Sequence, residues 1–293
     1  MIAGQPTLKW LSAALLMAAI GFGILGPAAP ARAAAAINDA DATASDRALA
    51  RALSGDLDGA RKEIASIGET TARDFSYARL ATLQAGQGNA ASAGTLLGMI
   101  SDTTRRQDAM RDVAIVLARK GDFRNASALS SKLAPASRDR LLGVMAAYEA
   151  ETVGLKEATA RLGQISDLGE RESATGLVAA GRARAGDVKT AFSVVAGISG
   201  KAAKVRAYML VARAFVSVDR RIEGLSAVRA GLDIVPKLAS GGERLKARAD
   251  AVNLLVDLGD PTGAADQASR IADAELRGFM KSVIENAGNL GVR

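Results

Sequence analysis

The stretch Gly121-Asp122-Phe123-Arg124-Asn125-Ala126 decides the fold, because variants of it recur along the chain about every 33 residues. It ends a run with helical periodicity, and it combines a glycine, an acid and, five residues after the glycine, an alanine. We call the position of the glycine the turn slot. The turn slots are Gly55, Gly88, Gly121, Val153, Gly186, Val218 and Gly259. Self-similarity at this period indicates stacked helical modules.

Each position of the stretch has a physical reason. Glycine after a helical run suits the left-handed residue that ends a helix. An Asp or Asn directly after it suits the N-cap of a new helix, since its side-chain oxygen accepts from a free amide. Such acids or amides follow six of the slots: Asp56, Asn89, Asp122, Asp187, Asp219 and Asp260. A turn without a spacer predicts two antiparallel helices.

Small side chains line both predicted helices of each module. Positions four apart share one helical face, so an alanine face predicts close helix approach. Seven residues before the slots stand Ala48, Ala81, Ala114, Ala146, Ala179, Val211 and Val252. Five residues after them stand Ala60, Ala93, Ala126, Ala158, Ala191 and Ala264, while the sixth copy has Gly224 one residue out of register. Twelve residues after them stand Ile67, Ile100, Leu133, Ile165, Ile198 and Ile271, which we expect to close the core.

An acid and an arginine four residues apart recur between the modules. The pairs are Glu69 with Arg73, Asp102 with Arg106, Asp167 with Arg171, and Asp273 with Arg277. One interpretation is a charged ladder that binds a ligand. The other is a structural device in which the acid begins a helix and the base follows one turn later. The spacing follows the repeat, which favours the structural interpretation.

These features resemble the tetratricopeptide-repeat family over residues 46–290, although the family's Trp and Pro are absent and its Tyr position is mostly unfilled. In most copies an apolar residue also stands nine after the slot, as in Ile64, Leu97, Leu162 and Val195. The resemblance implies an all-α, right-handed α-solenoid of about seven antiparallel helix pairs from Ser45 to Asp273. A helix over Ala274 to Asn286 would cap it. A divergent helical-hairpin repeat of another kind is the alternative.

Residues 1–33 have the pattern of a secretory signal peptide. Lys9 precedes 22 uncharged residues, 10–31, and Ala31-Arg32-Ala33 resembles a cleavage site, so we expect cleavage after Ala33. The alternative is that residues 10–31 remain as a membrane anchor. Either way the pattern predicts export to a bacterial periplasm. A G-x-G-x-x-G match at residues 21–26 lies inside this segment and lacks the strand and helix that a dinucleotide site needs.

The remaining chain divides into two parts. We expect residues 34–44 to be a flexible leader and residues 45–293 to form the repeat domain. The interval from Val218 to Gly259 is about eight residues longer than the others. The excess lies near residues 234–243, where we expect a longer helix or a loop that acts as a hinge.

Composition excludes most catalytic chemistry. The 293 residues include no His and no Cys, which removes histidine-based catalysis, disulfides and the usual zinc, haem and iron–sulfur ligands. We therefore expect no enzyme, no catalytic residues, no cofactor site and no metal site. Carboxylates alone can hydrolyse glycosides. However, Glu149 and Glu151, like Glu170 and Glu172, stand two apart and would point to different helix faces. We expect Glu149 and Glu151 on the solvated surface.

The charge and the stacked modules bear on the choice of partner. The net charge is +7, and removal of residues 1–33 would leave 36 basic and 31 acidic residues spread along the chain. No basic patch is evident, so a nucleic-acid partner is not expected.

Stacked helical hairpins offer extended surfaces, which predicts a non-catalytic scaffold or adaptor that binds a protein or peptide in the cell envelope. The membrane enters only if the signal segment stays uncleaved. The alternative is a glycan-binding component of polysaccharide export or the cell wall, using Tyr77, Tyr148, Tyr208 or Phe123.

Overall fold

In the computed structural model, which describes residues 39–289, every regular element is helical and no strand occurs in that range. The chain is therefore all-α, as predicted. Long helices, which we call first helices, alternate with short second helices. The first helices are α2 (Asp39–Leu53), α4 (Thr70–Gly86), α6 (Thr103–Arg119), α8 (Pro135–Thr152), α10 (Leu168–Arg184), α12 (Lys201–Ser217) and α14 (Gly241–Asp257). The second helices are α3 (Leu57–Ala65), α5 (Ala90–Gly98), α7 (Phe123–Ser130), α9 (Leu155–Leu162), α11 (Val188–Ala196), α13 (Arg221–Leu232) and α15 (Pro261–Ser269).

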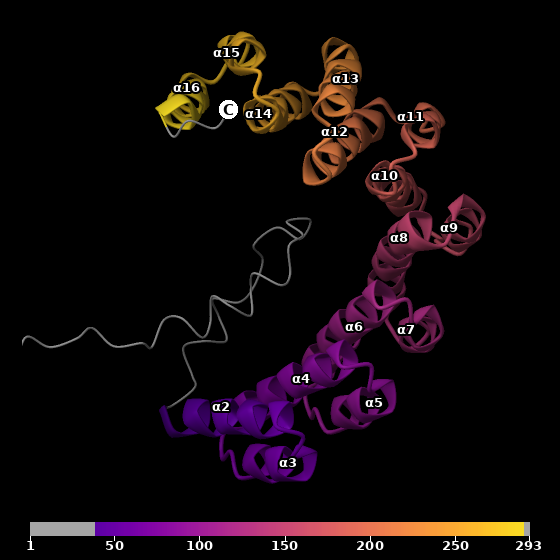
Figure 1. Cartoon of the computed structure of the whole chain (residues 1–293), viewed down its shortest axis with the longest axis vertical. Coiled ribbons are helices and arrows are strands. Elements are labelled where there is room, and N and C mark those ends of the chain that lie inside the picture. Colours follow the sequence, from indigo (N-terminus) through magenta and orange to yellow (C-terminus); the bar gives the residue numbers. More distant parts are fainter. Residues whose placement is uncertain (1–38, 290–293) are drawn as a thin grey trace, which may run out of the picture. The chain divides into compact units, whose positions relative to one another are not determined.

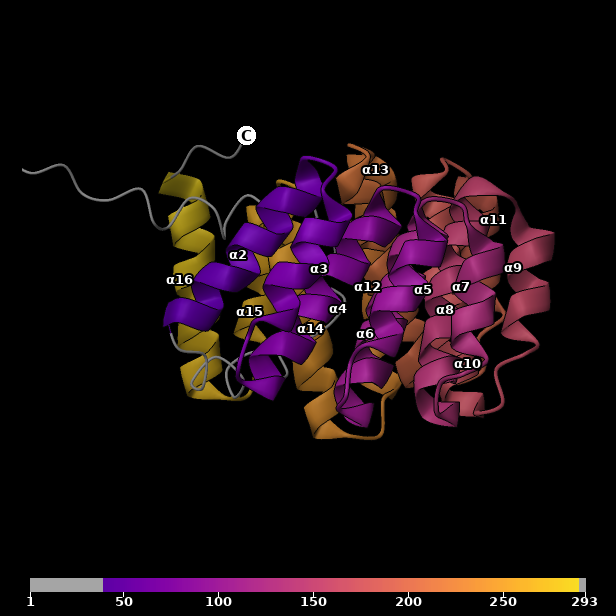
Figure 2. The ribbon, with the colours of Figure 1, turned by 90° about the horizontal axis from the view of Figure 1, so that it is seen from below.

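The described residues form two compact units that divide between Arg73 and Asp74, inside α4. In the first unit, α2 packs on α3. In the second unit, from α6 onward, each first helix contacts both its own second helix and the next first helix. First helices therefore form one layer of this unit and second helices the other (Figure 1). Figure 2 shows the same helices side-on.

The turns between first and second helices confirm the predicted role of glycine. Gly88 has φ 85°, its N–H donates to the Ala85 carbonyl, and the next N–H, of Asn89, donates to the Gln84 carbonyl. This pair of bonds is the Schellman motif, which requires a left-handed residue. Positive φ values of 75–91° also occur at Gly55, Gly121, Gly186 and Gly259. The predicted N-caps are confirmed by a side-chain bond at Asp56, Asp122, Asp187 and Asp260, but not at Asn89.

Two turns differ from the pattern. In the sixth turn the left-handed residue is Asp219 (φ 56°), so the slot lies there and the prediction of Val218 is wrong by one residue. Gly224 then stands five after the slot and is in register. A Cβ at Gly224 would lie 2.7 Å from Leu258, which explains why glycine replaces alanine. In the fourth turn Val153 keeps φ −111°, and Gly154 serves as the N-cap.

Where the acid and the arginine recur, they bind the backbone at two separate places. The acid caps the first helix: Asp102 accepts from Arg105 N, and Asp167 accepts from Glu170 N. The arginine reaches back to the carbonyl six residues before it, at the end of the preceding module. These bonds are Arg73 to Ile67, Arg106 to Ile100, Arg171 to Ile165, Arg244 to Leu238, and Arg277 to Ile271. The pattern is therefore structural, as favoured above.

A further side chain, not identified from the sequence, joins one first helix to the start of the next. Asp74, which is fully buried, accepts from Ser101 N at 2.9 Å and from Asp102 N at 2.8 Å. Asp139 makes the equivalent bonds to Ser166 N and Asp167 N. Gln107 accepts from Ala134 N, and Glu172 from Gly200 N, in the same way. We call these four residues the junction acceptors. They satisfy amides that a helix leaves free at its start.

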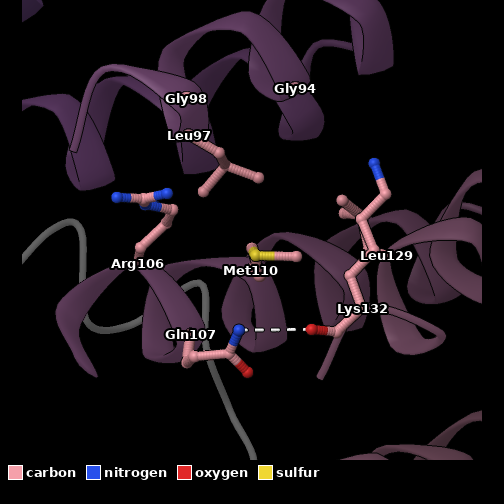
Figure 3. Close-up of a pocket in the computed structure, with 8 residues that line it drawn as sticks. All are labelled: Gly94, Leu97, Gly98, Arg106, Gln107, Met110, Leu129 and Lys132. Atoms are coloured by element: carbon pink, nitrogen blue, oxygen red, sulfur yellow. Dashed lines mark hydrogen bonds between the residues drawn. The ribbon is translucent and has the colours of Figure 1, made fainter. Parts of the chain in front are cut away.

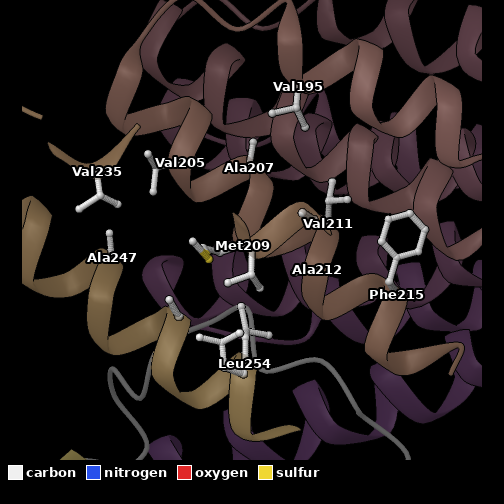
Figure 4. Close-up of a cluster of buried hydrophobic side chains, with 14 of the residues drawn as sticks. Val195, Val205, Ala207, Met209, Val211, Ala212, Phe215, Val235, Ala247 and Leu254 are labelled. Atoms are coloured by element: carbon white, nitrogen blue, oxygen red, sulfur yellow. The ribbon is translucent and has the colours of Figure 1, made fainter. Parts of the chain in front are cut away.

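The core between the two layers is built largely of small residues. Every alanine predicted to stand five after a turn slot is fully buried. Seven residues before the slots, with the sixth corrected to Ala212, every side chain is also fully buried. Larger side chains fill the last modules, where Phe215, Val211, Leu254 and Met209 pack together (Figure 4).

One prediction about the edge of the repeat domain is corrected. Residues 39–44 are not a leader, since α2 begins at Asp39 and buries Asp41 and Ala44; residues 34–38 lie outside the described range.

Near residues 234–243 the structure has the longer helix and loop that were expected, and the hinge role stays a prediction. The longer α13 leads into a 3₁₀ turn, η2 (Val235–Lys237), and both Val235 and Leu238 are buried because they are apolar.

The predictions for the last helix and for the signal peptide have different outcomes. The last helix, α16, runs Ala274–Asn289, as predicted within three residues. The predicted signal peptide lies outside the described range. Among the helices described, none combines the length and apolarity needed to span a bilayer.

The turn geometry predicts opposite effects for two glycines of one module. Gly88→Ala should destabilise the protein by about 1–2 kcal/mol, since alanine resists the left-handed conformation. Gly94→Ala, inside α5, should stabilise it by about 0.5–1 kcal/mol. A Cβ at either position meets no atom within 4 Å, so packing does not enter the comparison. Denaturant unfolding of both variants measures the difference; equal effects would contradict the assignment of Gly88.

Candidate binding surface

The first helices of the second unit present a face that no second helix covers. The residue seven before each slot packs toward the second helix and is fully buried, as at Ala146, Ala179 and Ala212. The residue nine before each slot lies about 200° further round the helix, on the opposite side. We call the side of α6, α8, α10, α12 and α14 that contains this position the first-helix surface.

An apolar row crosses the middle of the first-helix surface. The position nine before the slot is Val144 in α8, Leu177 in α10 and Leu210 in α12, and all three side chains are half-buried. Tyr148, one turn after Val144, is half-buried on the same side. Three neighbouring helices thus each expose part of one large aliphatic side chain. Such a row offers apolar contacts for a partner, although Leu210 also packs against the core.

Two ion pairs flank the apolar row where α8 meets α10. Toward the start of the helices, Arg140 Nε lies 3.2 Å from Glu170 Oε1. Toward their ends, Arg184 Nε lies 2.6 Å from Glu151 Oε2, with Arg184 only 11% exposed. Each pair joins the two helices, one at either end of their contact.

The helices under the row approach closely because glycine stands at the contact. A Cβ at Gly181 of α10 would lie 2.4 Å from the Ala147 carbonyl oxygen of α8. A Cβ at Gly143 would lie 2.9 Å from Ala174 Cβ. Since neither distance is tolerated, any larger residue would push α8 and α10 apart. At these contacts α8 and α10 therefore meet through backbone and small side chains.

Tyr148 is a neutral hydrogen-bonding group in this surface. Burial raises the pKa of its phenol, while the charges of Arg119 on α6 and Arg184 on α10 act in the opposite direction. Its hydroxyl therefore stays protonated at neutral pH and can donate a hydrogen bond to a partner.

The surface becomes acidic at α14. The position nine before the slot is now Asp250, and Asp257 follows two turns later. Burial is the largest influence on both carboxyls and raises their pKa, opposed by Arg213 of α12. The chemistry therefore changes along the layer, from aliphatic at α8–α12 to charged at α14.

Glu149 lies elsewhere, and the expectation that it is solvated is wrong. It is buried, and Arg161 of α9 donates to both of its carboxylate oxygens, with Nε 2.7 Å from Oε2. Arg161 also donates to Ser127 Oγ of α7. Arg161 therefore joins the two helices of its own module, α8 and α9, to α7 of the preceding module. Glu149 faces away from Glu151, as its spacing requires, so the two do not form a catalytic pair.

A second groove lies on the other side of the layer, between α5, α6 and α7 (Figure 3). It has a volume of about 340 Å³, and Leu97, Met110 and Leu129 line it. Its polar groups serve the fold: Gln107 donates to the Lys132 carbonyl, and Arg106 donates to the Ile100 carbonyl. This groove is the gap that short second helices leave over a first helix.

The comparisons and the search for metal ligands give no further assignment. No protein-family model matches the chain, and no curated protein matches it significantly. In residues 39–289 no group of three or more potential ligand side chains is placed to hold a metal ion.

The contrast between Glu149 and Glu170 gives a prediction. Glu149→Gln should destabilise the protein by about 3 kcal/mol, because it leaves the guanidinium of Arg161 buried without a countercharge. Glu170→Gln should cost less than about 1 kcal/mol, since Glu170 is 35% and its partner Arg140 68% exposed, so water screens the charge that remains. Thermal and urea unfolding of the two variants test this; similar losses would contradict a structural role specific to Glu149.

Proposed function

We propose that the chain is a tetratricopeptide-like, right-handed α-solenoid of about seven helix pairs that ends with α16 as its cap. The recurrence of the turn, the helix caps and the buried alanines at one period supports this. The character of α16 supports it as well. In the other first helices the position seven before the turn slot is buried. The equivalent position in α16 is Glu285, which is exposed. A polar outer side is what a terminal module needs.

The proposed role is a non-catalytic scaffold or adaptor that holds a protein or peptide partner on its first-helix surface. The observation that carries it is the apolar row of Val144, Leu177 and Leu210, flanked by two ion pairs. In stacked helical hairpins the layer of first helices forms the broad binding face. A row of aliphatic side chains at one register matches an extended partner segment that crosses successive helices.

Export to the cell envelope is the second part of the proposal. The sequence of residues 1–33 supports it, with cleavage after Ala33. A mature protein would then act in the periplasm. If the segment stays uncleaved, residues 10–31 would tether the same surface to the membrane.

Glycan binding is the alternative role. Sugars bind to exposed aromatic faces, and Tyr77 is buried at 7% exposure. Tyr148, Tyr208 and Phe123 are half-buried, and Tyr208 packs against Phe192 with ring centroids 6.0 Å apart. The aliphatic row therefore favours a protein partner over a glycan.

Site-specific photocrosslinking tests the scaffold role. A photoreactive residue at Leu210 should give discrete adducts with one protein, and the same residue at exposed Lys189 on α11 should not. Leu177→Asp should weaken capture at Leu210 by about tenfold, the loss expected for one buried aliphatic contact. Leu168→Asp is the matched control, because Leu168 is on the same helix but 72% exposed. Polysaccharide adducts, or equal capture in both variants, would contradict this role.

Processing of the leader is tested by mass spectrometry of the protein recovered from a bacterial periplasmic fraction. We expect the mature chain to begin at Ala34. A product that retains Lys9 and pellets with membranes would show the anchored alternative. A full-length product in the cytoplasmic fraction would overturn export.

A further inference from the structure

A small pocket between α12, η2 and α14 opens on the first-helix surface, beyond Leu210. Its volume is about 60 Å³. Its floor is apolar and buried, formed by Val205 and Met209 of α12, Leu238 after η2, and Ala247 of α14. Figure 4 shows Val205 and Met209 lying opposite Ala247. The floor suits one small aliphatic side chain.

The rim of this pocket carries charges of both signs. Arg206 and Lys246 are the cations, and Glu243 and Asp250 are the carboxylates. Arg206, Lys246 and Glu243 are exposed, so water already screens them and an added ion pair would stabilise little. Asp250 is half-buried and makes no ion pair within 4.0 Å in the described part of the chain. Its carboxylate is partly desolvated and has no direct partner, although Lys246 and Arg213 act on it at longer range.

The difference between the exposed charges of the rim and half-buried Asp250 determines which chemical group the pocket complements. A cation that docks beside the pocket restores favourable interactions to a carboxylate whose desolvation has already occurred. An anion would meet only solvated Arg206 and Lys246, next to two carboxylates that repel it. The pocket therefore complements an aliphatic group next to a positive charge.

We propose that this pocket is a subsite for one aliphatic side chain of the partner, and that a neighbouring cationic group of the partner pairs with Asp250. The proposal rests on the scaffold function, and it adds a chemical specificity to it. A partner segment would place aliphatic residues along the row from Val144 to Leu210 and a basic residue at α14.

The test uses the full chain labelled with ¹³C at methionine methyl groups and L-leucinamide as the probe. Leucinamide has an isobutyl group and an ammonium but no carboxylate. We expect it to shift the Met209 signal in a saturable manner. The Met110 signal, from the groove between α5 and α7, should not move. Glycinamide, which has the charge without the side chain, and N-acetyl-L-leucine, which has the side chain with a negative charge, should leave Met209 unchanged.

Two variants separate the contributions. Asp250→Asn should raise the dissociation constant of leucinamide about threefold to fivefold, the range for a partly screened ion pair. Ala247→Leu should abolish the shift by filling the pocket, and an unchanged Met110 signal shows that this variant is folded. Met209→Leu assigns the signal.

Several results would overturn the subsite. They are no Met209 shift with leucinamide, an equal shift with N-acetyl-L-leucine or glycinamide, or unchanged affinity in Asp250→Asn. The scaffold role is judged separately, by the adducts at Leu210. Adducts without a leucinamide response would leave the scaffold and remove the subsite, whereas a response without adducts would remove the scaffold.

Discussion

The contact between the two helices of each module is set by alanine, and most of the architecture follows from this. Alanine or another small residue stands at the fully buried positions seven before and five after the turn slots in nearly every module. Alanine lets helix backbones approach closely, but it removes little apolar surface from water. A single helix pair is therefore weakly stabilised, and stability must come from contacts with neighbouring modules. The isoleucines twelve after the slots, such as Ile100 and Ile165, supply larger buried side chains.

Hydrogen bonds between modules also make the stability of each module depend on its neighbours. A junction acceptor such as Asp74 or Asp139 is buried only because two backbone amides of the next first helix donate to it. The carboxylate and the helix start compensate each other, and removal of either leaves a buried polar group unsatisfied. The Glu149–Arg161–Ser127 network acts in the same way through the second helices. Neighbouring first helices are thereby held in a fixed register, and the first-helix surface inherits that register.

The sequence predicted the features whose chemistry is local. The glycine turns, the acid N-caps, the alanine faces and α16 are visible because each depends on a few consecutive residues and recurs at one period. The sixth turn was placed one residue early because aspartate at 219 takes the left-handed conformation usually left to glycine. Glu149 was misplaced because its partner, Arg161, belongs to the next helix and helical spacing alone does not identify it. The 3₁₀ turn η2 could not be specified from the sequence, because Val235 and Leu238 fill a gap that only the folded modules create.

The candidate surface had a signal in the sequence as well. Val144, Leu177 and Leu210 stand nine residues before their slots once the sixth slot is placed at Asp219. The junction acceptors Asp74, Gln107, Asp139 and Glu172 likewise recur at intervals of 32 or 33 residues. Both sets are missed when residue identity is the criterion, because what recurs is a property. This property is a half-buried aliphatic side chain in one set and an oxygen acceptor in the other.

The junction acceptors and the aliphatic row together explain why the first-helix surface changes from one helix to the next. Junction acceptors hold the helices from α4 to α12, and the aliphatic row runs over part of the same stretch. In α12, the position equivalent to a junction acceptor is Val205. Its side chain forms part of the floor of the α12–α14 pocket and cannot accept a hydrogen bond from a backbone amide. The longer α13 and η2 replace the missing bond with apolar packing around Val235. The loss of one polar junction, and the insertion that compensates for it, thus place a pocket where the aliphatic row gives way to Asp250.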